Sequence, residues 1–437
     1  MSLLFDAHAA IRLPLNSSNA FHSPRLQLSV GDTVKKGPAP SSAMGFWFPV
    51  EESQEGAANL LVPTFARGEG EPLDHARSRA AVFYNPLMRL NRDTAVLAAA
   101  VLGERLGRPV EVCEPMCGVG VRGVRLVLEA GVGKVLMGDL NPSGVQISEE
   151  NARRNGVADR MTVRFMDANL LLNLHSSPMN RLDYVDIDPF GSPSEFLDST
   201  VRATRDGGII ALTATDMAPL CGVSPTACLR KYGGKPLRTV YTHEVALRLL
   251  VGATVRAAAI HEMGLRPVFS YYADHYIRVY LALEHGAKPA DAALAEMGYV
   301  VHCPRCLHRE AVKGAYLKAS RNCPACGGAM VVGGPMWLSN LADDAFTGKM
   351  LEKAVKIGGW EPRLIHLVET IRGEIGFPPT YFHLDEFSRR AGTSSLNMAV
   401  VLGRLSTAGF RVARTHFDPR GIRTDATAAD LTNVIKG

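Results

Sequence analysis

The chain has 437 residues and a formal net charge of +5, with 46% apolar and 21% charged residues. This composition is typical of a soluble globular protein, and the length predicts two or three domains. No apolar run approaches the roughly 18 uninterrupted residues that a membrane span needs, so the sequence excludes a membrane protein.

Residues 1–43 are rich in serine and lack both periodicity and the apolar core of a secretory leader. We expect a disordered extension here, rather than an organelle address, and a cytoplasmic monomer. The rest of the chain is predicted to form three parts: residues 44–285, with extended structure around residues 60–62, then residues 286–334, and residues 335–437.

Residues 83–93 combine a ring, two Asn and two Arg beside a predicted loop. Phe83 either packs in the core or belongs to a lid over a bound ligand. A helix is predicted over residues 94–106, with Asn91 or Asp93 as its N-cap.

From Pro109 onward, strand-like apolar runs alternate with helical stretches at intervals of 21–28 residues. This spacing is typical of βαβ units, so a doubly wound parallel α/β domain is predicted over about residues 80–285. Residues 268–272 and 276–280 are predicted to pair antiparallel at the edge of that sheet. The runs end near Cys113, Gly138, Met166, Ile187 and Thr213.

The first predicted strand leads into a glycine turn that runs from Glu114 to Gly120. Glycines there let the backbone approach a ligand closely, and the following helix offers free amides. Gly118, Gly120 and Gly123 have the G-x-G-x-x-G spacing of the dinucleotide fingerprint, so the glycines alone do not tell a dinucleotide from another adenosine-bearing ligand. Glu114, four positions before Gly118, fits an S-adenosylmethionine site.

The next two predicted strands also end in acids. Asp139 can bind both ribose hydroxyls of an adenosine, and Asp167, followed by Ala168, can meet an adenine amine. Each acid alone is more often a cap or a turn former. Acids at successive strand ends beside a glycine turn predict an adenosine-bearing methyl donor.

The fourth strand ends in Asp188, which is followed at once by Pro189 and Phe190. A carboxylate, a rigid turn and a ring at one strand end suit the exocyclic amine of a nucleobase. The carboxylate would accept hydrogen bonds from the amine while the ring stacks on the base. The alternative is a strand-end turn with a helix N-cap.

Residues 211–216 are predicted to form a fifth strand, and residues 237–263 a long helix. The loop between them carries basic residues that form either a rim for a phosphate backbone or an ordinary exposed loop. These residues are Arg230, Lys231, Lys235 and Arg238.

Two cysteine pairs separated by sixteen residues follow. This spacing predicts a structural zinc site with four thiolate ligands, although His302 or His308 could replace one of them. A redox pair is the alternative. The predicted ligands are Cys303, Cys306, Cys323 and Cys326.

Helices are predicted over residues 384–390 and 394–408, and a strand over residues 409–416. Helix-helix-strand with basic residues at its end is a winged-helix-like pattern, used on nucleic acid or on protein. Residues 301–437 hold 18 Lys and Arg against 12 Asp and Glu, which favours contact with a polyanion.

Four motifs occur in one order: Phe83-Tyr-Asn-Pro with Asn91-Arg-Asp93, Asp186-Ile-Asp-Pro-Phe-Gly-Ser-Pro193, the two cysteine pairs, and Thr415-His-Phe-Asp-Pro-Arg-Gly-Ile-Arg-Thr-Asp-Ala426. Together they resemble the tRNA (guanine-N2)-dimethyltransferases that act at tRNA position 26. The resemblance covers about residues 50–430. It implies a class I methyltransferase domain, a zinc ribbon and a mainly helical, RNA-binding C-terminal part.

The resemblance also implies roles for individual residues. Asp188, Pro189 and Phe190 would hold the guanine, with Asp188 easing proton loss from N2. Cys117 departs from the family pattern, in which Ser or Ala is expected. The residues predicted to bind the methyl donor are Phe83, Arg92, Glu114, Gly118, Gly120, Arg122, Asp139, Asp167 and Ala168.

Three alternatives to this function remain open at this point. The first is a methyltransferase for an adenine amine or another guanine, although such families more usually carry a second proline after the acid. The second is a non-catalytic RNA-binding protein on a methyltransferase fold. A hydride-transfer enzyme is the third, and the glycine spacing is compatible with it.

Overall fold

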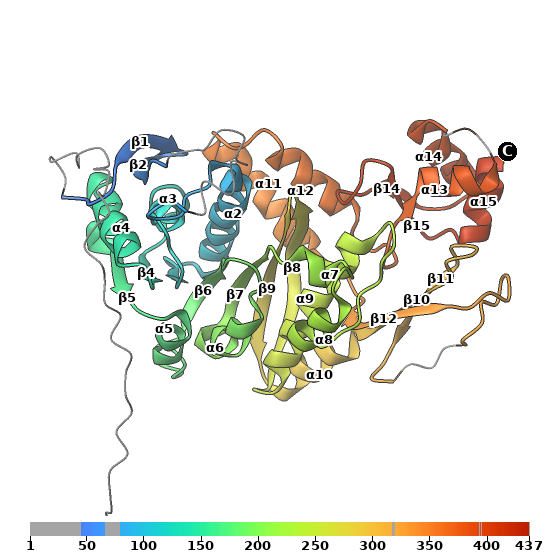
Figure 1. The fold of residues 1–437 in the computed structure, drawn as a ribbon, viewed down its shortest axis with the longest axis horizontal. Coiled ribbons are helices and arrows are strands. Elements are labelled where there is room, and N and C mark those ends of the chain that lie inside the picture. The colour runs from blue at the N-terminus through green and yellow to red at the C-terminus, as the bar shows by residue number, and fades with distance from the viewer. Residues whose placement is uncertain (1–44, 66–78, 317–319, 393, 395, 437) are drawn as a thin grey trace, which may run out of the picture.

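A computed structural model describes residues 45–65, 79–316, 320–392, 394 and 396–436. The extension predicted at residues 1–43 lies outside these residues. The described chain forms an elongated molecule, with a large sheet and its helices at one end and a smaller C-terminal part at the other (Figure 1).

A seven-stranded sheet forms the centre of the larger end. Its first five strands are parallel, and the chain passes outward from β3 to β4 and β5 before it returns to β6. The carboxyl ends of β3 and β6 therefore flank the switch point, where doubly wound sheets bind ligands. The five parallel strands, in spatial order, are β5 (Met161–Phe165), β4 (Lys134–Asp139), β3 (Glu111–Glu114), β6 (Leu182–Ile187) and β7 (Thr204–Ala214).

The predicted antiparallel edge is confirmed. β9 (Tyr276–His285) pairs antiparallel with β7 on one side and with β8 (Met263–Ala273) on the other. The turn between β8 and β9 lies at the same end of the sheet as the carboxyl ends of the parallel strands, because β9 runs against β7. The predicted doubly wound α/β domain is also confirmed, with each of the five strand ends within one residue of its predicted place.

Two hydrophobic clusters cover the two faces of the sheet. One face packs against a hairpin formed by β1 (Val50–Glu55) and β2 (Ala58–Pro63) and against five helices: α2 (Arg89–Leu106), α3 (Val121–Ala130), α4 (Pro142–Arg154), α11 (Asp344–Ile357) and α12 (Leu364–Gly373). The other face packs against α5 (Ala168–Leu174), α6 (Leu197–Ala203), α7 (Met217–Leu220), α8 (Pro225–Tyr232), α9 (Thr242–Ala259) and α10 (Ala287–Ala295).

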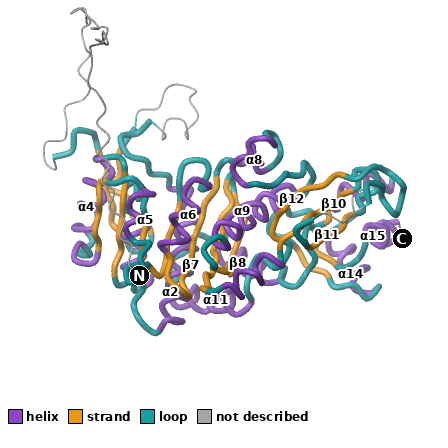
Figure 2. The backbone as a smooth tube through the Cα atoms, turned by 90° about the horizontal axis from the view of Figure 1, so that it is seen from below, coloured by secondary structure: helices purple, strands orange, loops and turns teal. Residues whose placement is uncertain are grey.

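A three-stranded antiparallel sheet joins the two ends of the molecule (Figure 2). It contains β10 (Met297–His302), β11 (Arg309–Lys313) and β12 (Val331–Trp337), with the cysteine pairs in the loops beyond its strands. The C-terminal part has its own core. It contains β13 (Phe382–His383), α13 (Leu384–Ala391), α14 (Met398–Thr407), β14 (Val412–Arg414), β15 (Gly421–Thr424) and α15 (Ala428–Lys436), which matches the predicted winged-helix-like arrangement.

Three predicted helix starts are wrong, and one of them is that of α14, which begins at Met398 rather than at residue 394. α2 begins at Arg89 rather than Thr94, and a short 3-10 helix capped by the Asn85 side chain precedes it. Asn91 and Asp93 lie buried inside α2, because they bond to arginines of α3 and not to the helix end. The predicted long helix begins at Thr242 instead of residue 237, and residues before it form loop and bridge structure.

α11 and α12 pack on the large sheet, although both lie beyond the cysteine pairs in the sequence. Buried side chains of these helices, such as Phe346 and Val368, belong to the same cluster as those of α2. The predicted limits of the three parts stay predictions. The packing, however, places α11 and α12 with the large sheet and not with the C-terminal core.

A buried ionic network fixes the C-terminal part to α9. Arg423 of β15 bonds to Glu244 of α9 at 2.9 Å and to Glu374, just beyond α12, at 2.7 Å. Glu374 also accepts hydrogen bonds from the His416 ring and the Thr415 hydroxyl. Burial opposes ionisation of Glu374, but His416 and Arg423 outweigh it and lower its pKa to about 2.

None of the helices in the described ranges is long and apolar enough to cross a membrane.

The Arg423→Met variant is expected to lose on the order of 3–5 kcal/mol of stability, because it leaves two buried carboxylates with one cation fewer. Urea unfolding of the full chain measures this loss. The matched control is Arg411→Met, which removes an exposed ion pair with Asp425 and is expected to cost about 1 kcal/mol or less. Equal stability of the two variants would contradict a structural role for the network.

Candidate active site

A cavity of about 740 Å³ opens at the carboxyl ends of the parallel strands. This volume lies in the range of small-molecule sites. Every residue predicted to bind the methyl donor or the base lines it, except Gly120: Phe83, Arg92, Glu114, Gly118, Arg122, Asp139, Asp167, Ala168, Asp188, Pro189 and Phe190.

The glycine turn between β3 and α3 shapes one wall. Gly118 has a φ of +54°, and its amide donates to Asp139 Oδ2 at 2.8 Å. Gly120 has a φ of +73° at the start of α3, and a Cβ there would meet Ser148 Oγ at 2.9 Å. Gly120 therefore permits the turn, while Gly118 faces the cavity.

Asp139 and Asp167 each line the cavity and also hold local structure. Asp139 accepts hydrogen bonds from the amides of Gly118 and Asn141, and Asp167 caps α5 by accepting from the Leu170 amide. Cap formation and ligand binding are thus compatible at these strand ends, since each carboxylate has lone pairs beyond those used by the amides.

Arg122 lies at the bottom of the cavity and is almost fully buried. Its guanidinium bonds to Glu114 at 3.0 Å, to the Asn91 amide oxygen at 2.8 Å and to Asp188. Asp186 lies 3.4 Å away. One side chain from α3 thus joins the acids at the ends of β3 and β6.

A second buried arginine completes this cluster. Arg278 of β9 bonds to both oxygens of Asp186, at 2.9 and 2.5 Å. Burial opposes ionisation of Asp186, but Arg122 and Arg278 outweigh it, so the pKa of Asp186 lies below its usual range. Burial raises the pKa of Glu114 to about 8 against the opposing charge of Arg122. The cluster therefore holds three carboxyl groups for two guanidiniums, and the pKa of Glu114 lies above its usual range because of burial.

Asp188 has one oxygen bound and one available. Oδ2 accepts from Arg122, whereas Oδ1 accepts no hydrogen bond from the residues that the structure describes. The Phe190 side chain beyond it is 74% exposed, and its ring lies edge-on to that of Phe83 with centroids 4.7 Å apart. A free carboxylate oxygen and two rings thus meet in one cavity.

Arg92 lines the cavity but is already engaged. It forms an ion pair with Glu55 of β1 at 2.5 Å and donates to the Asn85 carbonyl oxygen at 3.0 Å. These bonds hold the predicted lid segment against α2. The structure therefore gives Arg92 a supporting position at the cavity wall.

Sequence reasoning missed several cavity residues. Asp274, His275 and Tyr276 come from the β8–β9 turn, and Arg363 comes from the start of α12. Arg363 bonds to both oxygens of Asp274, at 3.0 and 3.1 Å. The predicted hairpin was the available signal for the first three, whereas nothing in the local sequence marks Arg363, which lies far along the chain.

The cavity suits S-adenosylmethionine. Gly118 faces it without a side chain, and a Cβ at this position would lie 3.0 Å from the Phe83 carbonyl oxygen. Carboxylates of Asp139 and Asp167 stand at adjacent strand ends, where an adenosine would present hydroxyl and amine donors. The residues present fit the predicted donor.

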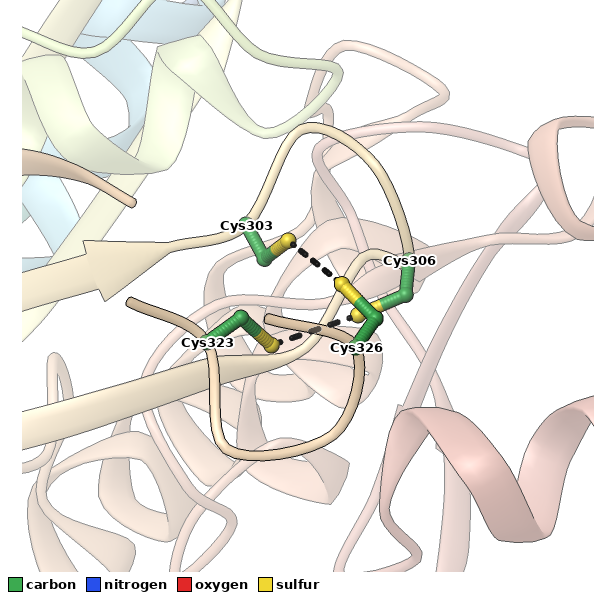
Figure 3. A group of neighbouring side chains, drawn as sticks. All are labelled: Cys303, Cys306, Cys323 and Cys326. Atoms are coloured by element: carbon green, nitrogen blue, oxygen red, sulfur yellow. Dashed lines mark hydrogen bonds between the residues drawn. The ribbon is translucent and has the colours of Figure 1, made fainter. Parts of the chain in front are cut away.

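The four predicted zinc ligands meet outside this cavity (Figure 3). Their sulfur atoms all lie within 4.8 Å of one another, with the closest pairs 3.5 Å apart. Tetrahedral zinc with Zn–S bonds of about 2.3 Å separates its sulfurs by roughly 3.8 Å, so the cluster fits the ion. Among the described residues, neither His302 nor His308 joins the cluster.

Comparison with known proteins agrees with this geometry. A family model described as N2,N2-dimethylguanosine tRNA methyltransferase matches residues 56–436. The tRNA (guanine(26)-N(2))-dimethyltransferase of Methanothermobacter thermautotrophicus is 36% identical over 388 residues, covering 88% of this chain and 98% of the relative. The enzyme of the same name from Halobacterium salinarum is 38% identical, covering 86% and 98%.

Two further matches add detail. The tRNA (guanine(26)-N(2)/guanine(27)-N(2))-dimethyltransferase of Aquifex aeolicus is 35% identical, covering 87% of this chain and 95% of the relative. The solved complex of Trm1 from Pyrococcus horikoshii with S-adenosyl-L-methionine has a TM-score of 0.75 and 31% identity, covering 88% of this chain and 99% of that one.

Glu114 is expected to make stability depend on pH. Its folded pKa of about 8 exceeds the unfolded value of about 4.3, so the folded state binds more protons between these values and stability falls as pH rises through that window. Glu114→Gln removes this titration. The variant is expected to gain on the order of 3 kcal/mol relative to the original protein between pH 5 and 8, measured by urea unfolding without methyl donor. Parallel pH profiles would contradict the assignment.

Purified protein is expected to contain one zinc ion per chain by elemental analysis. Cys306→Ser should lower the zinc content and the unfolding temperature, because the neighbouring Leu307 packs in the C-terminal core. Cys221→Ser, which lies outside the cluster, is the control and should keep the metal. A protein without zinc would refute the site.

Proposed function

We propose roles for the cavity residues on the premise that this chain belongs to the N2,N2-dimethylguanosine tRNA methyltransferase family. The enzyme transfers methyl groups from S-adenosylmethionine to the exocyclic N2 of guanine 26 in tRNA and forms N2,N2-dimethylguanine. The predicted family, reaction and donor are thereby confirmed. The alternatives of a hydride-transfer enzyme and a non-catalytic binding protein are set aside.

The observation that supports the residue roles is the hydrogen bonding of the Asp188 carboxylate. It lies at the switch point of the sheet with Oδ2 on Arg122 and Oδ1 open to the cavity. An acceptor fixed in this way can receive an N–H from an exocyclic amine without first giving up a protein partner. Asp188 is therefore assigned to the guanine N2.

Asp188 acts on a weak nucleophile. The N2 lone pair of guanine is delocalised into the ring, and it must localise on nitrogen as the new N–C bond forms. Asp188 Oδ1 accepts one N2–H, orients the lone pair toward the reacting methyl group and takes the proton that N2 loses. S-adenosylmethionine would supply an electrophilic methyl group on its sulfonium, and the methyl–sulfur bond would break as the N–C bond forms. Positioning of the two reactants accounts for most of the acceleration.

Phe190 and Pro189 are assigned to the base. The target guanine lies within tRNA structure, so it must leave its stack at a cost of a few kcal/mol. Stacking on an aromatic ring recovers about 1–3 kcal/mol per base, and the Phe190 ring is exposed for this purpose. Phe83, whose ring lies against that of Phe190, lines the same cavity.

The methyl donor is assigned to the opposite half of the cavity. Asp139, at the end of β4, would bind the ribose hydroxyls. Asp167 and Ala168, at the start of α5, would bind the adenine. Gly118 gives the donor close access to the backbone, and Glu114 with Arg122 forms the floor beneath it. We also propose that the enzyme acts as a monomer in the cytoplasm and that the basic C-terminal part contacts the tRNA.

Transfer of labelled methyl groups onto unmodified tRNA tests the function. Nucleoside digestion and mass spectrometry should find N2,N2-dimethylguanine, and replacement of guanine 26 should abolish it. Label that persists after this replacement but disappears when guanine 27 is replaced would move the site to the second guanine named for the Aquifex relative. Label on adenine would overturn the assignment.

Asp188→Asn is expected to lower the rate of methyl transfer by on the order of 10²–10⁴-fold, because the amide cannot take the N2 proton. Donor affinity, measured by calorimetry, should stay within about threefold, since the donor-binding residues are unchanged. Asp188→Ala should behave alike. Near-normal turnover in either variant would remove Asp188 from the chemistry.

A further inference from the structure

The turn that carries Phe190 is held from its far side. The Gly191 amide donates to Thr215 Oγ1 at 2.8 Å, and the Thr215 amide donates to the Gly191 carbonyl oxygen at 2.9 Å. Thr215 follows β7 directly. These bonds fix the backbone after Phe190 to the end of the neighbouring strand.

A side chain from α8 reaches the same turn. The hydroxyl of Tyr232 lies 2.7 Å from Ser192 Oγ and donates to Asp216 Oδ1 at 2.5 Å. Tyr232 is fully buried. Burial, together with the hydrogen bond to Asp216, raises its pKa, so it remains a hydrogen-bond donor at physiological pH. The assigned roles of the cavity residues make no use of this contact.

The exposed side of α8 and the turn after it is basic. The 27 residues between Asp216 and Glu244 contain no acidic residue. Lys231 Nζ lies 3.0 Å from Asp216 Oδ2, next to Tyr232. The exposed cations of this segment are Arg230, Lys231, Lys235 and Arg238.

The position of α8 suits contact with an RNA backbone on one side and with the Phe190 turn on the other. It lies at the border of the structure near β12 (Figure 2), and the backbone of Lys235 bridges to Gly334 of that strand. Its buried side contacts the turn that holds the base, and its open side faces solvent. Phosphate contacts there would fix the strand that carries the target nucleotide, as backbone contacts do in nucleic-acid complexes.

We propose that α8 couples docking of the tRNA backbone to placement of the target guanine. The exposed cations of α8 and of the segment after it bind phosphates near the target nucleotide, and Tyr232 acts as a positioning residue that holds the Phe190 turn through Ser192. This inference rests on the proposed role of Phe190 as the stacking ring. It assigns α8 as the link between RNA binding and base positioning.

Tyr232→Phe tests the positioning role, because it removes one hydroxyl and keeps the buried ring. Under single-turnover conditions with saturating tRNA, the methyl-transfer rate is expected to fall on the order of tenfold. Affinity for donor and tRNA should stay unchanged. A variant whose rate equals that of the original protein would overturn this role.

A double-mutant cycle separates positioning from general stability. If Tyr232 acts through the Phe190 turn, Tyr232→Phe should change the rate by less than about twofold in a Phe190→Ala background. Equal effects of Tyr232→Phe in both backgrounds would mean that it acts elsewhere, and would refute the proposal. Unfolding temperatures of all four proteins show whether each is folded at the assay temperature.

Charge removal tests the docking role. Arg230→Ala, Lys235→Ala and Arg238→Ala combined should weaken tRNA binding. The slope of log affinity against log salt should become shallower by about 0.7–0.9 for each phosphate that the variant no longer neutralises. Lys288→Ala, an exposed cation on α10, is the control. An unchanged slope in the triple variant would refute phosphate binding at α8.

These outcomes remain distinct from failure of the proposed function. If guanine 26 is not the substrate, the original protein itself gives no label on tRNA that depends on that guanine. If only the α8 inference fails, the original protein labels guanine 26 and the α8 variants do so equally well.

Discussion

The site depends on one buried cation among several acids. Arg122 reaches from α3 to Glu114, Asp186 and Asp188, which end β3 and β6. Three carboxyl groups this close would repel one another when ionised. The guanidinium makes their proximity possible because it bonds to all three at once, while Arg278 holds Asp186 from the other side.

The same interaction determines which carboxylate can react. Asp186 is committed to two arginines, and both oxygens of Glu114 accept hydrogen bonds, from Arg122 and from the Gly123 amide. Of the three carboxyl groups around Arg122, Asp188 is the one that lines the cavity with one oxygen held by Arg122 and the other without a hydrogen bond from the described residues. The availability of Asp188 thus follows from how the acids of this cluster share two arginines.

The sequence predicts this site well where the signal is local. Apolar runs that stop at an acid locate the strand ends, and a doubly wound sheet brings such ends together, so Glu114, Asp139, Asp167 and Asp188 could be placed in advance. The partners of a side chain that lie far away in the sequence could not be predicted. Asn91 and Asp93 resemble helix caps by residue type, yet they bond to Arg122 and Arg125 inside the folded core. Ion pairs of this kind leave no periodic pattern in the sequence. The ion pair between Arg363 and Asp274 at the cavity leaves none either.

The three-stranded sheet with the cysteine pairs interrupts a domain that continues beyond it. Helix α10 precedes it, and α11 and α12 return to cover the large sheet. Its first and last residues, Met297 and Trp337, are directly paired partners on adjacent strands. The chain therefore enters and leaves the three-stranded sheet at adjacent positions, as is typical of an insertion. Its strands nevertheless contribute Val300, Met336 and Trp337 to the hydrophobic cluster on one face of the large sheet, so removal of this insertion would expose apolar surface of the catalytic domain.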